Sequence, residues 1–308
     1  MAVSARSIPM ARGSFNWSHF AFLAPVHLSV LLAPFTFTWT NLAVAVALHA
    51  LAGGLGICVG YHRLLTHKSF VARRPLVYAL ATLGAFAIEG GPVSWVANHR
   101  RHHQYSDGPG DPHDSTRGFW WAHMGWIFVA VPESELDERR RKYAADIAAD
   151  PYLRWLEDRY WTLSIPLAVG LYLWGGWGMV VWGMGVRLVA TYHVTYLVNS
   201  AAHFWGYQTY RSGDRSRNNW WVALLGYGEG WHNNHHAFPW SARHGLKVWE
   251  VDVSYAFIRA CRLVGLVTRI HVPSADRRRA LALDGKAAIL ESAAQVVAPA
   301  PDPGNSAA

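Results

Sequence analysis

The fold is decided by residues 13–62, which read GSFNWSHFAFLAPVHLSVLLAPFTFTWTNLAVAVALHALAGGLGICVGYH. These 50 residues contain no Asp, Glu, Lys or Arg. One membrane-spanning helix needs only about 20 apolar residues, so the stretch is long enough for two. Pro34 and the threonine-rich residues 36–40 favour a turn between them. We therefore expect a helical hairpin in lipid, with spans at about residues 20–37 and 41–60.

A second charge-poor region covers residues 160–210 and is interrupted only by Arg187. Its glycine-rich residues 175–178 indicate a tight turn between two further spans, at about residues 160–176 and 178–200. The sequence thus predicts an all-α integral membrane protein with four transmembrane helices. Neither turn contains Lys or Arg, whereas the segments that flank the two hairpins do. The positive-inside rule therefore places both termini in the cytoplasm.

The remaining segments are expected to form a cytoplasmic helical cap, from residues 61–159 and 201–292. Residues 75–88 are apolar but too short for a span, so we expect them to be buried or interfacial. The Ala- and Pro-rich end, residues 293–308, is expected to be disordered. The chain has only two cysteines among its 308 residues and no metal or redox spacing of them, so thiol chemistry is not expected.

Histidines are clustered rather than scattered. Eight of them form one pair and two triplets, which are named at the end of this paragraph. Histidines three and four positions apart share one side of a helix, so we expect each triplet to present three imidazoles toward one point. One further histidine follows the fourth span, with Asn199 one helical turn before it. Because the second and fourth spans run in the same direction, all of these groups reach the same membrane surface. The pair is His62 and His67, the triplets are His99, His102, His103 and His232, His235, His236, and the single residue is His203.

Nine imidazoles exceed what one metal ion accepts, so two metals are expected. An all-nitrogen ligand set suits iron, zinc or copper rather than magnesium or calcium. Structural zinc sites are usually closed, four-coordinate and cysteine-containing, which this chain does not supply. A redox-active metal pair is therefore favoured.

Four histidine-bearing motifs carry a resemblance to a known family. They are His62-Arg-Leu-Leu-Thr-His67, His99-Arg-Arg-His-His103 with Asp111-Pro-His113, Asn199-Ser-Ala-Ala-His203, and Gly228-Glu-Gly-Trp-His-Asn-Asn-His-His-Ala-Phe238. Together they resemble the histidine boxes of the membrane fatty acyl desaturases, the family of stearoyl-CoA desaturase and the cyanobacterial delta-9 acyl-lipid desaturases. The resemblance covers most of the chain, and we assign residues 1–292 to one desaturase domain.

The resemblance implies a cytoplasmic cap that holds two iron ions, with zinc as a substitute in recombinant protein. It implies that Asn199 holds an iron-bound water. It also implies an O2-dependent reaction that removes two hydrogens from a saturated acyl chain and gives a cis double bond, at the delta-9 position. The nine implied ligands are His62, His67, His99, His102, His103, His203, His232, His235 and His236.

In the resembling enzymes a bent tunnel beside the metals holds the acyl chain. Trp95 and Thr195 match residues that line its bend, and Tyr196 stands where a second Trp is usual. Ordinary packing between helices is the alternative for all three.

The group that carries the acyl chain can be inferred from charged residues that this chain does not have. Acyl-CoA desaturases have an Arg-Asp pair where this chain has Ala97 and Asn98, and a basic pair where it has Ala130 and Val131. Phosphate recognition commonly needs such groups. The expected substrate is therefore an acyl chain on a glycerolipid, with acyl-CoA left open.

Three carboxylates close to the boxes, Asp107, Asp111 and Glu229, are candidates to orient ligand imidazoles, with helix capping as the alternative. Electrons must come from a separate donor of the ferredoxin or cytochrome b5 type with its reductase, because the sequence has no haem, nicotinamide or iron–sulfur pattern. The basic runs 139–142 and 277–279 suit an acidic donor or anionic membrane lipid, and nucleic acid is not expected. The expected location is a bacterial cytoplasmic membrane.

Two other functions compete with desaturation. A fatty acyl or lipid hydroxylase could use the same histidine scaffold, because oxygen rebound after one hydrogen abstraction gives an alcohol. A zinc-binding membrane receptor or transporter is the non-enzyme alternative. A transporter should carry polar groups near the bilayer midplane, whereas these clusters lie just outside the spans.

Overall fold

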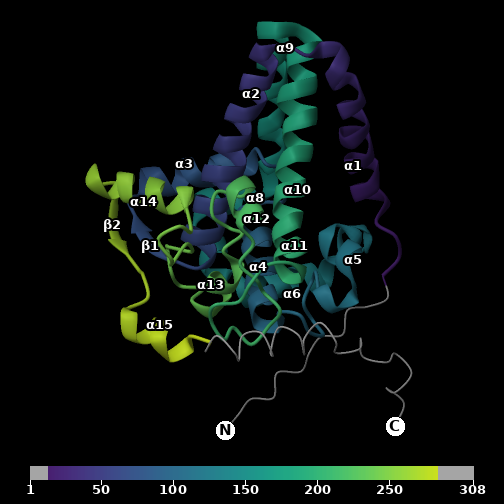
Figure 1. Ribbon diagram of the computed structural model, residues 1–308. Coiled ribbons are helices and arrows are strands. Elements are labelled where there is room, and N and C mark those ends of the chain that lie inside the picture. The colour runs from purple at the N-terminus through teal and green to yellow at the C-terminus, as the bar shows by residue number, and fades with distance from the viewer. Residues whose placement is uncertain (1–12, 284–308) are drawn as a thin grey trace.

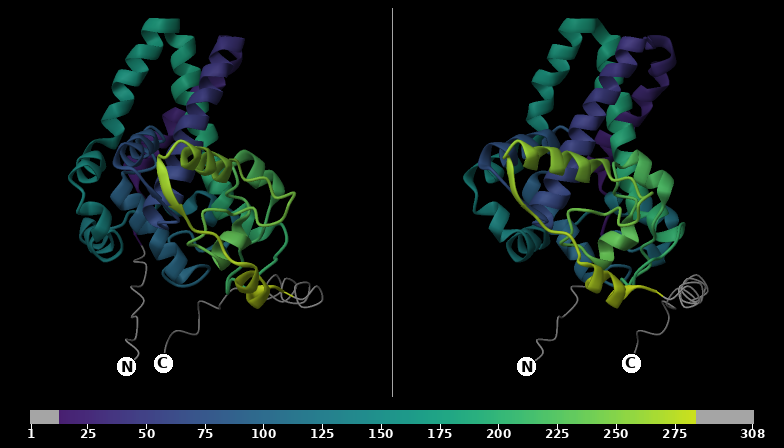
Figure 2. Two further views of the ribbon diagram at one scale, coloured as in Figure 1. Left: turned by 90° about the vertical axis from the view of Figure 1, so that its left-hand side faces the viewer. Right: turned by 60° about the vertical axis from the view of Figure 1, so that its left-hand side comes forward.

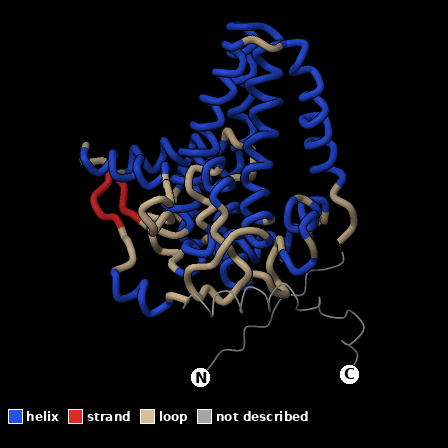
Figure 3. Tube along the Cα trace, viewed as in Figure 1, coloured by secondary structure: helices blue, strands red, loops and turns tan. Residues whose placement is uncertain are grey.

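The computed structural model describes residues 13–283. The predicted tail, residues 293–308, lies outside this range. Long helices form a stalk at one end of the molecule, and short helices and loops form a cap at the other (Figures 1 and 2). Helices dominate the described residues, and strands are confined to one short pair (Figure 3).

Three stretches of the stalk are long and apolar enough to cross a membrane. They are Trp17–Thr36, Trp39–Thr66 and Pro151–Phe204. Side chains such as Leu31 and Phe35 are largely exposed on them, as expected of a surface that faces lipid. The first comprises α1 (Trp17–Ser29) and the 3₁₀ segment η1 (Val30–Thr36), and the second α2 (Trp39–His49) and the π-helical η2 (Ala50–Thr66). These findings support an integral membrane protein.

The first two stretches are joined by a short connection between Thr36 and Trp39. Thr38 caps α2, because its side chain accepts a hydrogen bond from the Asn41 backbone at 3.0 Å. The Asn41 amide in turn donates to the Thr36 carbonyl at 2.8 Å. The threonine-rich residues thus form the turn where the sequence indicated one.

The third stretch folds back on itself. It contains α9 (Ser164–Val180), the π-helical η6 (Val181–Val186), α10 (Arg187–Asn199) and α11 (Ala201–Phe204). Inside α9 the backbone leaves the helical region at Gly175 and Gly176, where Gly176 has φ +67°. Glycine adopts positive φ at little cost. The chain reverses here at the far end of the stalk (Figure 1).

Residues 74–85 form α3 (Arg74–Ala85), which packs one face against η2. Leu80, Ala81 and Ala85 are buried there. The contact is close, because a Cβ added at Gly56 would lie 2.3 Å from the backbone nitrogen of Gly84. The apolar run 75–88 is thus a packed helix with an additional turn after it, and it is not among the candidate spans.

The cap is built from short elements before and after the stalk helices of the third stretch, and it includes residues 151–163 of that stretch. A core of buried apolar residues, including Val59, Leu80, Val96, Leu156 and Ile258, joins η2 to α3, α4, α8 and α14. The cap elements are α4 (Pro92–Tyr105), η3 (Ser115–Arg117), α5 (Phe119–His123), η4 (Gly125–Phe128), α6 (Glu133–Tyr143), α7 (Ala145–Ala148), α8 (Pro151–Arg159), η5 (Tyr160–Leu163), α12 (Trp220–Leu225), α13 (His232–Ala237), α14 (Val253–Leu263) and α15 (Ala275–Leu281). Strand β1 (Phe70–Ala72) pairs antiparallel with β2 (Val267–Ile270) and ties the last elements to the end of η2.

Candidate metal centre

The nine predicted histidines lie in two adjacent groups where η2, α4, α11 and α13 meet. Within each group, one nitrogen from every imidazole lies within 4.8 Å of the others. Group one contains His62, His67, His99, His103 and His235, and group two contains His102, His203, His232 and His236.

This division corrects the expectation that each triplet presents three imidazoles toward one point. On α4, His99 and His103 face group one, whereas His102 faces group two. On α13, His232 and His236 face group two, whereas His235 faces group one. Neighbouring helical residues point about 100° apart, so only the pairs four residues apart share one group. Each triplet therefore contributes to both groups and holds them side by side.

Four imidazoles are oriented by buried carboxylates. A carboxylate accepts hydrogen bonds, so the Nδ1 atom of each of these rings is the donor and its Nε2 atom keeps a free lone pair. The contacts are His62 Nδ1 to Glu229 at 2.6 Å, His102 Nδ1 to Asp111 at 2.9 Å, His203 Nδ1 to Asp107 at 3.0 Å and His236 Nδ1 to Asp214 at 2.5 Å.

The Nε2 atoms converge on the centre of each group. In group one, His235 Nε2 lies 3.1 Å from His62 Nε2 and 2.9 Å from His103 Nε2. In group two, His232 Nε2 lies 3.0 Å from His203 Nε2. Two lone pairs at such distances repel unless a proton or a metal ion lies between them. The donor set therefore fits two metal ions, one in each group.

Burial of the imidazoles also favours metal binding. Burial first, and then the neighbouring imidazoles, lower the pKa of His99, His103, His232 and His235 well below the usual range. A neutral imidazole is the form that ligates a metal. His67 adds a buried Nε2 atom that has no hydrogen-bond partner within residues 13–283.

Arg63, the residue after His62, is fully buried and holds one of the orienting carboxylates. Its Nε donates to Glu229 at 3.0 Å, and its Nη1 donates to Asp252 at 2.9 Å. Burial alone would raise the pKa of Glu229, but the Arg63 guanidinium and the nearby imidazoles lower it well below the usual range. Glu229 is therefore an ionised acceptor beside His62.

The predicted tunnel residues lie at the foot of the stalk, next to group one. Trp95 stacks on His99, with ring centroids 5.1 Å apart. A carboxylate that the sequence reasoning did not assign, Glu89, joins Trp95 to Thr195. It accepts from Trp95 Nε1 at 3.3 Å and from Thr195 Oγ1 at 2.9 Å. Tyr196 is buried in a separate apolar cluster, where its ring stacks on that of Tyr192, with centroids 6.1 Å apart.

Sequence reasoning also missed Asp214 and His244. Asp214 lies in the loop before α12 and orients His236. The His244 ring centroid lies 4.5 Å from that of His235, and its Nδ1 atom is 3.2 Å from Glu229. Neither residue lies at a recognisable sequence spacing from a predicted ligand. Glu89 could have been noticed in the sequence, because it is the carboxylate that ends the apolar run 75–88.

Asn199 is the last residue of α10 and is half-buried, four residues before His203. Its side chain forms no hydrogen bond to another of the described residues, 13–283.

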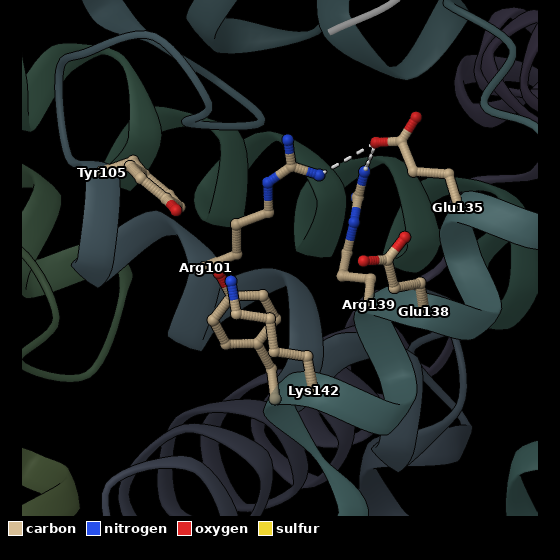
Figure 4. A pocket seen from close by; sticks show the side chains of 7 residues that line it. Arg101, Tyr105, Glu135, Glu138, Arg139 and Lys142 are labelled. Carbon is tan, nitrogen blue, oxygen red and sulfur yellow. Dashed lines mark hydrogen bonds and ion pairs between the residues drawn. The ribbon is translucent and has the colours of Figure 1, made fainter. Parts of the chain in front are cut away.

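A small pocket between α4 and α6 contains paired charges rather than predicted site residues (Figure 4). Glu135 of α6 accepts from Arg101 at 3.1 Å and from Arg139 at 3.0 Å. Arg139 also donates to Asn98 at 2.6 Å. These contacts fasten α6 to α4, the helix that carries three of the nine histidines.

Comparison with known proteins gives one consistent result. A family model described as fatty acid desaturase matches residues 37–252. The chain is 47% identical over 266 residues to the sn-1 stearoyl-lipid 9-desaturase of Anabaena variabilis. The aligned region covers 86% of this chain and 96% of that protein. The chain is 43% identical over 274 residues to the sn-2 palmitoyl-lipid 9-desaturase of Nostoc sp., covering 88% and 96%. It is 42% identical over 263 residues to the acyl-CoA C20 delta5-desaturase of Anemone leveillei, covering 85% and 83%.

Proposed function

The chain belongs to the fatty acid desaturase family, and we propose that it inserts a cis double bond at the delta-9 position of saturated acyl chains carried on glycerolipids. It is an oxidoreductase. The observation that carries this conclusion is the match over most of the chain to desaturases that are named for lipid-linked substrates and for position 9. Ala97 and Asn98, which stand where acyl-CoA enzymes carry an Arg-Asp pair, support the lipid-linked substrate.

We infer that the two groups of imidazoles hold two iron ions. All nine predicted ligands are nitrogen donors, which suit iron, and Asn199 supplies an amide for a bound water. When bound, the iron pair supplies the reduction of O2 that makes an unactivated C–H bond reactive, with O2 reduced to water. Zinc can fill the same sites in recombinant protein.

The chain's own residues orient and protect this centre. Four carboxylates, Asp107, Asp111, Asp214 and Glu229, accept from Nδ1 atoms and direct the Nε2 atoms inward. Arg63 keeps Glu229 ionised beside His62. Because these contacts are buried, the orientations of the four imidazole rings are fixed before a metal ion binds.

The acyl chain is proposed to pass between α4 and α10, beside group one. Trp95 lies against the ligand His99, and Glu89 links it to Thr195 of α10. This bridge joins the two helices beside the ligand His99. The carbon atoms held there determine where the double bond forms, and Tyr196 adds an aromatic wall further along α10.

We propose that the reversal at Gly175–Gly176 makes the third apolar stretch cross the bilayer twice, giving four spans. The cap and both termini then lie in the cytoplasm of a bacterial cell, because the loops that carry Lys and Arg are on the cap side. A ferredoxin or cytochrome b5 type protein with its reductase supplies electrons from that compartment. The desaturase domain comprises residues 1–292.

The competing functions receive less support. The relatives are named as desaturases, so the hydroxylase alternative is not favoured. Family membership likewise argues against a zinc receptor or transporter.

The test is lipid analysis of a desaturase-deficient bacterial host that expresses the chain and an electron donor, during a short isotope pulse. We expect a new alkene between carbons 9 and 10, labelled first in intact glycerolipid. An alcohol as the main product would overturn desaturation. Label that appears first in unsaturated acyl-CoA would overturn the lipid-linked substrate.

A further inference from the structure

The loop between α11 and α12 connects the surface to group two. Asp214 of this loop accepts from His236 Nδ1 at 2.5 Å. The Arg215 backbone nitrogen donates to Asp107 at 2.7 Å, and Asp107 accepts from His203 Nδ1 at 3.0 Å. Arg211 and Gly213 of the same loop are exposed. Group two is therefore separated from the surface by a single layer of hydrogen-bonded residues.

Helix α15 lies against this loop. The Arg211 nitrogen donates to the Leu281 carbonyl at 2.8 Å, and the Leu283 nitrogen donates to the Thr209 carbonyl at 3.0 Å. All three views place α15 at the end of the cap that is farthest from the stalk (Figures 1 and 2). In the proposed orientation the bilayer surrounds the stalk, so a soluble protein is the partner that can reach α15.

Five arginines give this region a positive charge. Within residues 13–283, only Arg279 among them has a carboxylate ion-pair partner, Asp276. We call the set the arginine surface. It consists of Arg211, Arg215, Arg277, Arg278 and Arg279.

The other basic run, on α6, lies in a helix that carries as many carboxylates as cations. Arg139 pairs with Glu135, and Arg140 pairs with Glu133 and Asp137. Arg141 and Lys142 are exposed on the same helix. An acidic partner gains less there, because the carboxylates of α6 offset its cations.

We propose that the arginine surface is the docking site of an acidic one-electron carrier protein, which would supply electrons to the metal that group two would hold. This inference rests on the proposed function. Each double bond requires two donor molecules, each oxidised by one electron. These two electrons, the two released with two protons from the acyl chain, and two protons from water reduce one O2 to two waters.

The test measures binding of an oxidised, acidic [2Fe–2S] ferredoxin to the full-length protein in nanodiscs of uncharged lipid, at low and high salt. The double variant Arg277→Glu/Arg279→Glu reverses the charge of two exposed side chains that belong to neither group of imidazoles. We expect its affinity at low salt to fall at least about tenfold, and the affinity of the unmodified protein to fall as salt rises.

Arg141→Glu/Lys142→Glu is the matched control, because it changes the net charge equally on exposed residues of α6. We expect it to bind within about twofold of the unmodified protein. Unchanged binding by the α15 variant would overturn the inference, as would a larger loss in the α6 variant. The binding measurement requires neither metal nor turnover. A protein that binds the carrier at the arginine surface but never forms an alkene would instead contradict the proposed function alone.

Discussion

The Nδ1 atom of His236 lies 2.5 Å from a carboxylate oxygen of Asp214, and both side chains are almost completely buried. The two residues come from different elements, α13 and the loop before α12. Their contact fixes the ring so that His236 Nε2 faces His102 Nε2, 3.3 Å away. Asp214, which belongs to no sequence motif, thus orients His236, which was predicted from its histidine box.

Asp214→Ala is expected to weaken metal binding without removing a ligand. The His236 ring loses its hydrogen-bond acceptor and its fixed orientation, so we expect an affinity loss of about 10- to 100-fold. Competition with a chelator measures it. His236→Ala should lose the metal of group two and all turnover, and His271→Ala, outside both groups, should bind as the unmodified protein does. Equal affinity in the Asp214 and His271 variants would contradict the orienting role.

His244→Ala is expected to reduce metal affinity less than His235→Ala. His235 belongs to group one, whereas His244 contacts it through ring packing and through Glu229. We expect the His244 variant to keep its metal content at saturating iron and the His235 variant to lose it. Metal analysis after gel filtration separates the two, and equal loss in both variants would make His244 a ligand.

Glu89→Gln is expected to change how stability depends on pH. Burial raises the pKa of Glu89 to about 7, although its hydrogen bonds to Thr195 and Trp95 act in the opposite direction. A carboxyl whose pKa is higher in the folded state stabilises the fold fully only below its unfolded pKa of about 4.5, and this contribution is lost as pH rises to about 7. Gln cannot ionise. The variant should therefore gain, relative to the unmodified protein, roughly 2 to 3 kcal/mol between pH 4 and pH 8.

Thermal unfolding at several pH values measures this difference. Glu138→Gln changes an exposed carboxyl of α6 and serves as the control. A difference between the Glu89 variant and the unmodified protein that is constant with pH would show that the buried carboxyl does not titrate in this range.

Gly56→Ala is expected to destabilise the contact between η2 and α3. The added Cβ would lie 2.3 Å from the Gly84 nitrogen, and backbone cannot move aside cheaply. We expect a loss of about 1 to 3 kcal/mol in the free energy of unfolding. Gly170→Ala is the matched control, because no atom lies within 4 Å of its added Cβ. Equal melting temperatures in the two variants would contradict this packing.

The sequence predicted the apolar stretches and the nine clustered histidines because both depend on local spacing. Runs without charge mark helices that face lipid, and residues 36–40 and 175–178 lie at chain reversals in the structure. Helical spacing also placed the triplets on α4 and α13. It did not predict that each triplet is divided between the two groups. The spacing within one triplet does not show where the histidines of the other helices lie.

The orienting partners could be predicted only where they lie near a motif. Asp107, Asp111 and Glu229 are close to histidine boxes in the sequence and contact His203, His102 and His62. Asp214, His244 and Glu89 reach the site through tertiary folding of loops, which no spacing encodes. Trp95 and Thr195 were predicted by resemblance to line the tunnel, and the carboxylate that joins them was not predicted.

The most direct test of the account is the iron content of the purified protein after anaerobic loading with ferrous iron and removal of unbound metal. Two groups of inward-facing imidazoles predict two iron ions per chain in the unmodified protein. They predict one per chain in His103→Ala, which loses a group-one ligand, and one in His232→Ala, which loses a group-two ligand. A folded, unmodified protein that holds fewer than two iron ions per chain would contradict the two-metal centre on which the proposed chemistry depends.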